Sequence, residues 1–183
     1  MKRAVSSTVD RRPDQVTIVE FEPGICAIGT WLNVIVIVWW ASATGSAVER
    51  LERVTVLLRE LYPDKSSHVH FVKNRAGLPS AAARSAFVKI MKEHESHIAN
   101  CAVVVGGSGF WASTMRSAIT SMRVISPRSF EMRLHGTWRE ILEWLPSSHQ
   151  YRTGVELKPQ MLERVLYDAE HWTSAELEEA STR

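Results

Sequence analysis

The sequence predicts an α/β domain built on a single mixed, mostly parallel sheet with crossover helices, preceded by a three-strand opening. Short runs rich in valine and isoleucine follow one another closely after residue 14, as expected for β-strands. From residue 46 onward, helical stripes of apolar residues alternate with short strands, a pattern typical of parallel strands joined by right-handed crossovers. Apolar residues make up 45% and charged residues 23% of the 183 residues, which indicates a globular domain.

Three strands are expected to open the domain. Apolar and polar residues alternate in 15–22, as in a half-buried strand, and Pro23-Gly24 then turns the chain. The second and third strands are expected at 25–31 and 34–40, joined by the tight connection Leu32-Asn33. Because 34–40 is apolar on both faces, it is expected in the centre of the sheet.

The same region is also a candidate membrane span, since no charged residue lies between Glu22 and Glu49. Gly29, Thr30 and Asn33 interrupt the apolar run, which falls short of the roughly 20 apolar residues that a spanning helix needs. Two buried strands are therefore expected, and membrane association is not.

Three crossover helices are expected next. Ser46 and Glu49 form a capping box for the first helix, which Pro63-Asp64 ends. A short strand at 69–73 precedes a second helix with Pro79 in its first turn. The apolar stripes of these two helices are Val48, Leu51, Val54, Leu58 and Leu61, then Ala83, Phe87, Ile90, Met91, His94 and Ile98.

The remaining elements repeat the alternation. A buried strand at 101–105 leads through a glycine loop to a third helix at 111–123, and 130–134 is the last strand. A second capping box, Thr137-Trp138-Arg139-Glu140, opens a helix that Pro146 ends.

The chain is divided on this basis into a disordered basic arm (1–14), the α/β domain (15–148), a linker (149–158) and an acidic amphipathic helix (159–183). The acidic helix could fold back onto the basic body or engage a partner, and folding back is favoured.

Charge and cysteine content exclude several classes of protein. The 22 Lys and Arg residues against 20 Asp and Glu residues give a net charge of +2, too small for a nucleic-acid binder that acts through bulk charge. Two cysteines, Cys26 and Cys101, are too few for a disulfide-built secreted scaffold. The start of the chain has no apolar signal segment, so a cytoplasmic location is expected.

The loop Gly106-Gly107-Ser108-Gly109 joins a strand to a helix, where backbone N–H groups could hold an anion. It lacks the Lys-Ser/Thr of a P-loop and completes neither G-x-G-x-x-G nor G-x-S-x-G. A tight turn that needs positive φ also explains the glycines and is the favoured interpretation.

A candidate protein-binding surface surrounds the start of the second helix. Ser80 lies where a hydroxyl or phosphate is favoured, between Arg75 and Arg84, which could pair with an acidic group. Phe110 and Trp111 follow the glycine loop and could anchor a partner.

Catalytic and metal sites are not expected. None of the four aspartates ends a predicted strand, where open α/β sheets place their chemistry. The pairs His68/His70 and His94/His97 lack further ligands at suitable spacing. No catalytic residue, metal or cofactor is therefore assigned.

The element order and several local features resemble the STAS domain, the fold of bacterial anti-sigma-factor antagonists. The resemblance covers Gln15 to Ser148, and its closing segment 137–145, with a Trp-Leu pair, is similar to the final STAS helix. By position, Ser80 is the nearest match to the phosphorylatable serine of such domains. Members switched by a kinase show Asp-Ser-Ser-Gly at that turn, whereas this chain has Asn74-Arg75-Ala76-Gly77. The resemblance implies a small module that docks on another protein.

The function expected from the sequence is that of a non-catalytic regulatory or scaffold module acting by protein–protein interaction. Its partner would be another protein with an acidic surface, or a further copy of this chain. The alternative is a domain that binds a small anionic ligand, such as a nucleotide, at Gly106–Gly109.

Overall fold

The computed structural model describes residues 15–74, 76–125 and 129–182. The expected basic arm at 1–14 and Arg75 of the candidate surface lie outside the described residues.

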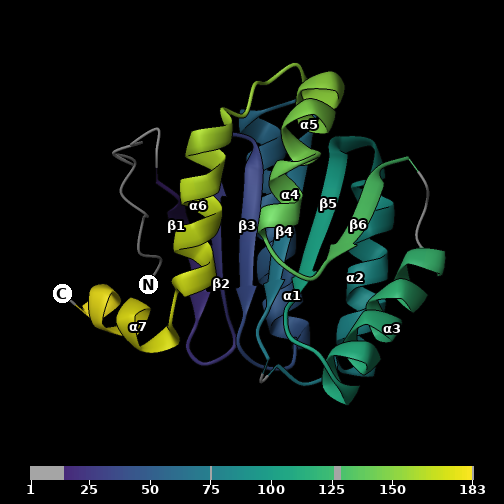
Figure 1. Ribbon diagram of the computed structural model, residues 1–183, viewed down its shortest axis with the longest axis vertical. Coiled ribbons are helices and arrows are strands. Elements are labelled where there is room, and N and C mark those ends of the chain that lie inside the picture. The colour runs from purple at the N-terminus through teal and green to yellow at the C-terminus, as the bar shows by residue number, and fades with distance from the viewer. Residues whose placement is uncertain (1–14, 75, 126–128, 183) are drawn as a thin grey trace, which may run out of the picture.

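The sheet has six strands in the order β1-β2-β3-β4-β5-β6, so each strand lies beside its sequence neighbour (Figure 1). The strands β1, β2 and β3 are mutually antiparallel, and β3 to β6 are parallel. This confirms the mixed, mostly parallel sheet with a three-strand opening. The strands are β1 (Thr17–Glu22), β2 (Cys26–Trp31), β3 (Val34–Trp39), β4 (Ser66–Val72), β5 (Ile98–Val105) and β6 (Glu131–His135).

Helices cover both faces of the sheet (Figure 1). The crossover helices α1 (Gly45–Leu61), α2 (Ala81–Glu93) and α3 (Phe110–Ile125) lie on one face, and a short 3₁₀ turn (Glu95–His97) follows α2. The other face carries α4 (Arg139–Leu142), α5 (Leu145–Thr153) and α6 (Pro159–His171), and α7 (Ser174–Thr182) follows α6. None of the helices in the described part of the chain has the length and apolar character that a membrane crossing requires.

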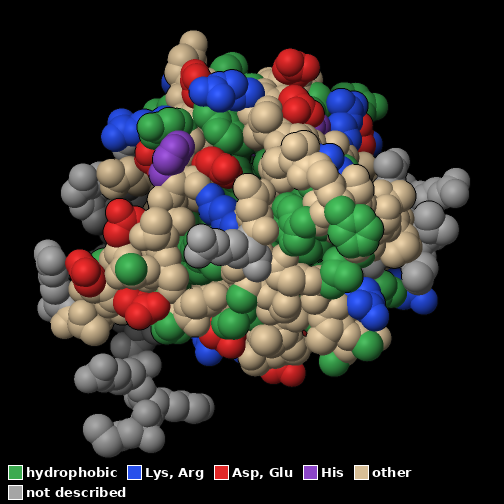
Figure 2. All heavy atoms as spheres, turned by 60° about the horizontal axis from the view of Figure 1, so that its bottom comes forward, with side chains coloured by type: hydrophobic (Ala, Val, Ile, Leu, Met, Phe, Trp, Pro, Cys, Tyr) green, Lys and Arg blue, Asp and Glu red, His purple; other side chains and the backbone are tan. Residues whose placement is uncertain are grey.

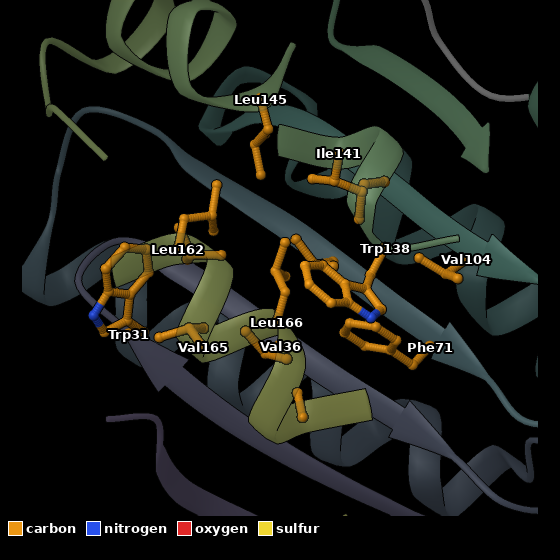
Figure 3. Close-up of a cluster of buried hydrophobic side chains, with 14 of the residues drawn as sticks. Trp31, Val36, Phe71, Val104, Trp138, Ile141, Leu145, Leu162, Val165 and Leu166 are labelled. Atoms are coloured by element: carbon orange, nitrogen blue, oxygen red, sulfur yellow. The ribbon is translucent and has the colours of Figure 1, made fainter. Parts of the chain in front are cut away.

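The strand β3 is buried along its whole length, as its two-faced apolar sequence predicts. Val36 points toward α6, where Val165 and Leu166 contact it within one core, and Trp138 lies beside Phe71 (Figure 3). On the opposite face, alternate residues of β3 pack against α1 and α2, and β5 packs against α3.

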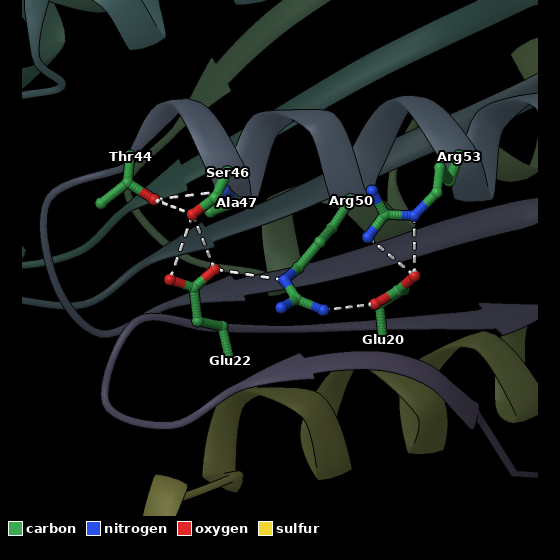
Figure 4. Close-up of polar contacts among 7 residues, drawn as sticks. All are labelled: Glu20, Glu22, Thr44, Ser46, Ala47, Arg50 and Arg53. Atoms are coloured by element: carbon green, nitrogen blue, oxygen red, sulfur yellow. Dashed lines mark hydrogen bonds and ion pairs between the residues drawn. The ribbon is translucent and has the colours of Figure 1, made fainter. Parts of the chain in front are cut away.

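Ion pairs hold the edge strand β1 against α1 (Figure 4). Arg50 donates to Glu20 at 2.7 Å and to Glu22 at 3.2 Å, and Arg53 lies 3.1 Å from Glu20. Hydrogen bonding to Glu20 raises the pKa of Arg50. Among the strands of this sheet, β1 pairs only with β2. The ion pairs with α1 therefore give β1 a second connection to the rest of the domain.

Replacing Arg50 by Met is expected to lower the free energy of unfolding by about 1 kcal/mol, because two charge-assisted contacts are lost while the apolar stem is kept. Arg53→Met, at a more exposed side chain, is the matched control and should cost less. Urea titrations measure both. An equal loss in the two variants would contradict a special role for Arg50.

Several helix boundaries differ from the sequence prediction. The helix α2 begins after Pro79 and ends before Ile98. Two helices, α6 and α7, stand in place of one after residue 158.

The N-cap of α1 is Thr44, whose Oγ1 accepts from the Ala47 backbone N–H at 3.2 Å, and not Ser46. The Ser46 hydroxyl instead donates to Glu22, so the helix begins before the expected capping box.

Another difference concerns Pro146, which was expected to end a helix. It occupies the first turn of α5, where a missing N–H costs no helical hydrogen bond. The helix continues to Thr153 and buries His149, so the first half of the expected 149–158 linker is helical. The irregular connection is shorter, from residue 154 to 158.

The C-terminal segment folds back on the sheet, as favoured from the sequence. Four α6 residues are fully buried against it: Leu162, Val165, Leu166 and Ala169. At the end of β4, Lys73 donates to the backbone oxygen of Glu170, and its Nζ lies 3.7 Å from that carboxylate. The Trp40 indole donates to Trp172 O at 3.1 Å.

Candidate functional site

The carboxyl ends of the parallel strands meet at one edge of the sheet, at the bottom of Figure 1. Ligands of open α/β sheets usually bind there. A Cβ on Gly106 would lie 3.8 Å from Gly136 O and 3.9 Å from Asn74 Oδ1, so the loops after β4, β5 and β6 are neighbours. Figure 2 looks onto this carboxyl edge and shows hydrophobic side chains gathered to the right of its centre.

The glycine loop forms the tight turn that its sequence predicts. Gly107 and Gly109 have φ values of +81° and +88°, which favour glycine. Arg116 of α3 donates to the carbonyl oxygens of Val105 at 2.8 Å and of Gly107 at 3.2 Å. These contacts explain the loop as a structural turn. The binding of an anion at Gly106–Gly109, Ser108 included, stays a prediction.

The start of α2 lies beside this loop. Ser80 is the N-cap of α2, and its Oγ accepts from the Ala83 N–H at 3.1 Å. Arg84 is exposed and donates to Pro79 O at 2.7 Å. Both side chains therefore fix the loop-to-helix junction while remaining at the surface.

Two adjacent aromatic residues begin α3 and differ in their surroundings. The Trp111 ring is half-buried, and its indole donates to Ala76 O at 2.9 Å, which ties α3 to the loop before α2. Phe110 is 89% exposed. Leu78, in the loop that Trp111 holds, is 46% exposed. We call Leu78, Ser80, Arg84, Phe110 and Trp111 the docking surface.

A histidine–carboxylate pair at the end of β6 was not expected from the sequence. His135 Nδ1 lies 3.4 Å from Glu140 Oε2, and the Trp144 indole donates to His135 Nε2 at 2.9 Å. Burial lowers the His135 pKa despite Glu140. Since Trp144 occupies Nε2, that nitrogen is not free to accept a proton from a substrate.

A buried polar network lies at the opposite, amino edge. Asn33 Nδ2 donates to Lys65 O, so its Oδ1 faces His149 Nε2 at 2.8 Å and accepts the ring proton. His149 Nδ1 then accepts from the Ser67 hydroxyl at 2.7 Å, and Ser67 Oγ accepts from Asn100 Nδ2 at 3.0 Å.

This network brings together a serine, a histidine and an asparagine, an arrangement similar to the Ser-His-Asp and Cys-His-Asn triads of hydrolytic enzymes. Asn33, Ser67 and His149 are each at most 1% exposed. A substrate therefore cannot reach the Ser67 hydroxyl, and the network acts as a scaffold that attaches α5 to the sheet.

Neither histidine pair considered from the sequence is joined by a third ligand group in the described part of the chain. His68 and His70 lie on the face that α1 and α2 cover, with ring centroids 6.2 Å apart. Among the described residues, the three groups whose ligand atoms lie within 4.8 Å of one another are Glu52, Glu93 and His94. His94 thus lies beside two carboxylates.

A scan against protein-family models found no matching family, and a search of curated proteins found no match to this sequence.

Proposed function

We propose that this chain is a non-catalytic, STAS-like regulatory or scaffold domain that docks another protein at its carboxyl edge. The observation that carries the proposal is Phe110, a large apolar side chain that is 89% exposed beside a fixed tryptophan. Rigid aromatic side chains bind partners with little loss of side-chain entropy.

Two further features support the docking surface. The bond from Trp111 to Ala76 O holds the aromatic pair and the α2 loop in one arrangement before any partner arrives, which lowers the entropic cost of docking. Arg84, which is exposed in the first turn of α2, adds a positive charge, so an acidic partner is favoured.

Replacing Phe110 by Ala is expected to abolish capture of the partner while changing the free energy of unfolding by less than about 0.5 kcal/mol, because the side chain is exposed. The measurement compares proteins retained by tagged wild type and variant, identified by mass spectrometry.

Tyr151→Ala is the matched control, since Tyr151 is an equally exposed aromatic residue, at 90%, on α5. Loss of one stoichiometric partner in Phe110→Ala but not in Tyr151→Ala would support the proposal. Retention of every partner by both variants would refute it.

A further inference from the structure

Three side chains that can coordinate a metal ion meet where α1 packs against the end of α2. They are Glu52 of α1, Glu93, which is the last residue of α2, and His94, the residue after it. One ring nitrogen of His94 and one oxygen of each carboxylate all lie within 4.8 Å of one another. Because Glu52 belongs to a different helix, only the packing of α1 against α2 brings the three groups together.

The His94 ring is enclosed in the protein without a hydrogen-bond partner. The residue is 5% exposed, and its Nδ1 makes no hydrogen bond with any described residue. Burying a polar nitrogen without a partner is unfavourable. Metal coordination at the ring would offset this cost, since a histidine nitrogen without a proton is a metal ligand.

The surroundings keep the His94 ring in the form that binds a metal. Burial lowers the pKa of His94 and Arg59 lowers it further, while Glu52 and Glu93 act in the opposite direction. A metal ion binds the neutral imidazole and not the protonated one. The backbone N–H of His94 caps α2 by donating to Ile90 O at 2.9 Å, and the C-terminal end of a helix favours a positive charge.

The two carboxylates are open to a cation. Glu52 is half-buried and makes no hydrogen bond or ion pair with a described residue. Glu93 Oε2 lies 3.8 Å from Lys89 Nζ, and both of these side chains are about half exposed or more, at 49% and 62%. Such exposed pairs are weak, so a divalent ion held by two carboxylates can displace the lysine.

The donor set selects the metal. One imidazole nitrogen and two carboxylate oxygens suit Zn²⁺, which takes three protein ligands and a water in an open site. Mg²⁺ prefers oxygen ligands in an octahedral arrangement. Ligand atoms of a tetrahedral Zn²⁺ site lie about 3.4 Å apart, so the groups need to approach by about an ångström, which the exposed Glu93 side chain allows.

We propose that Glu52, Glu93 and His94 bind one Zn²⁺ ion, with water in the fourth position, and that the ion ties α1 to the end of α2. The site lies at the opposite end of α2 from Ser80 and Arg84 of the docking surface. The proposal therefore does not depend on the docking function.

The test titrates the full chain with Zn²⁺ and, separately, with Mg²⁺. Calorimetry should show one saturable Zn²⁺ ion per chain and a Mg²⁺ affinity lower by about tenfold or more. The temperature of unfolding should rise with the Zn²⁺ concentration, because the unfolded chain does not hold the three ligands together. Zn²⁺ binding without saturation, an unchanged unfolding temperature, or equal affinities for the two ions would overturn the proposal.

Two variants locate the ion. Glu52→Gln and Glu93→Gln keep the size of each side chain, remove one ligand charge, and should each weaken Zn²⁺ binding by about tenfold or more. Glu60→Gln is the matched control, since Glu60 is an exposed glutamate of α1 outside the cluster, and it should leave the affinity unchanged. Wild-type affinity in either ligand variant, or an equal loss in Glu60→Gln, would refute the site, even if a His94→Gln variant does not fold.

Discussion

Lowering the pH from 7 to 5 is expected to remove about 6 kcal/mol from the free energy of unfolding, about 2 kcal/mol for each of three buried histidines. Burial lowers the pKa of His68 from 6.5 to about 3, and those of His70 and His149 from 6.5 to about 4. The unfolded chain therefore binds protons below pH 6.5 that the folded chain does not. This stability is fully present above pH 6.5 and is lost as the pH falls toward 4.

Urea unfolding at a series of pH values measures the effect. His68→Met should reduce the pH-dependent loss of stability by the share of one ring, about 2 kcal/mol between pH 7 and 5, because one proton-binding group is removed. Leu166→Ala, a core variant without a histidine, should lower stability by a similar amount at every pH. A wild-type stability that does not change between pH 6.5 and 4.5 would contradict the neutral state of these rings.

Replacing His149 by Ala is expected to destabilise the domain by about 4 kcal/mol, because it leaves Asn33 Oδ1 and the Ser67 hydroxyl proton buried without a partner and opens a cavity. The ring is fully buried and joins Asn33, just before β3, to β4 and α5. The loss should appear in both thermal and urea unfolding.

Gln150→Ala is the control on the same helix, since Gln150 is the exposed neighbour of His149. It should change the free energy of unfolding by no more than about 0.5 kcal/mol. Similar losses of unfolding free energy in the two variants would mean that α5 is sensitive to any substitution. The buried network would then contribute no more to stability than an exposed side chain does.

The pattern of apolar residues along the sequence correctly predicted the strand whose burial it determines. The run Val34–Trp39 is apolar on both faces, and the strand is buried throughout. A local signal that allows two interpretations led to a wrong prediction at Pro146. Proline ends a helix when it lies inside one and begins a helix when it lies in the first turn, and Pro146 is of the second kind.

The site could be predicted only in part. The turn and helix signals around Ser80 predicted its position near the start of α2. The capping box predicted that Glu140 reaches back to Thr137, and Glu140 accepts from the Thr137 backbone N–H at 3.1 Å. The proposed metal site joins α1 to the end of α2. The His149 network joins residues 33, 67, 100 and 149, and no spacing in the sequence indicates such contacts.

The return of α6 across the sheet has a consequence for biosynthesis. The α6 side chains that cover Val36 come more than 120 residues after it in the sequence. At a typical rate of about 5–20 residues per second, a ribosome adds them on the order of ten seconds later. During that interval one face of the newly made sheet is uncovered. The nascent chain therefore exposes aliphatic strands that chaperones can bind until its last helices are complete.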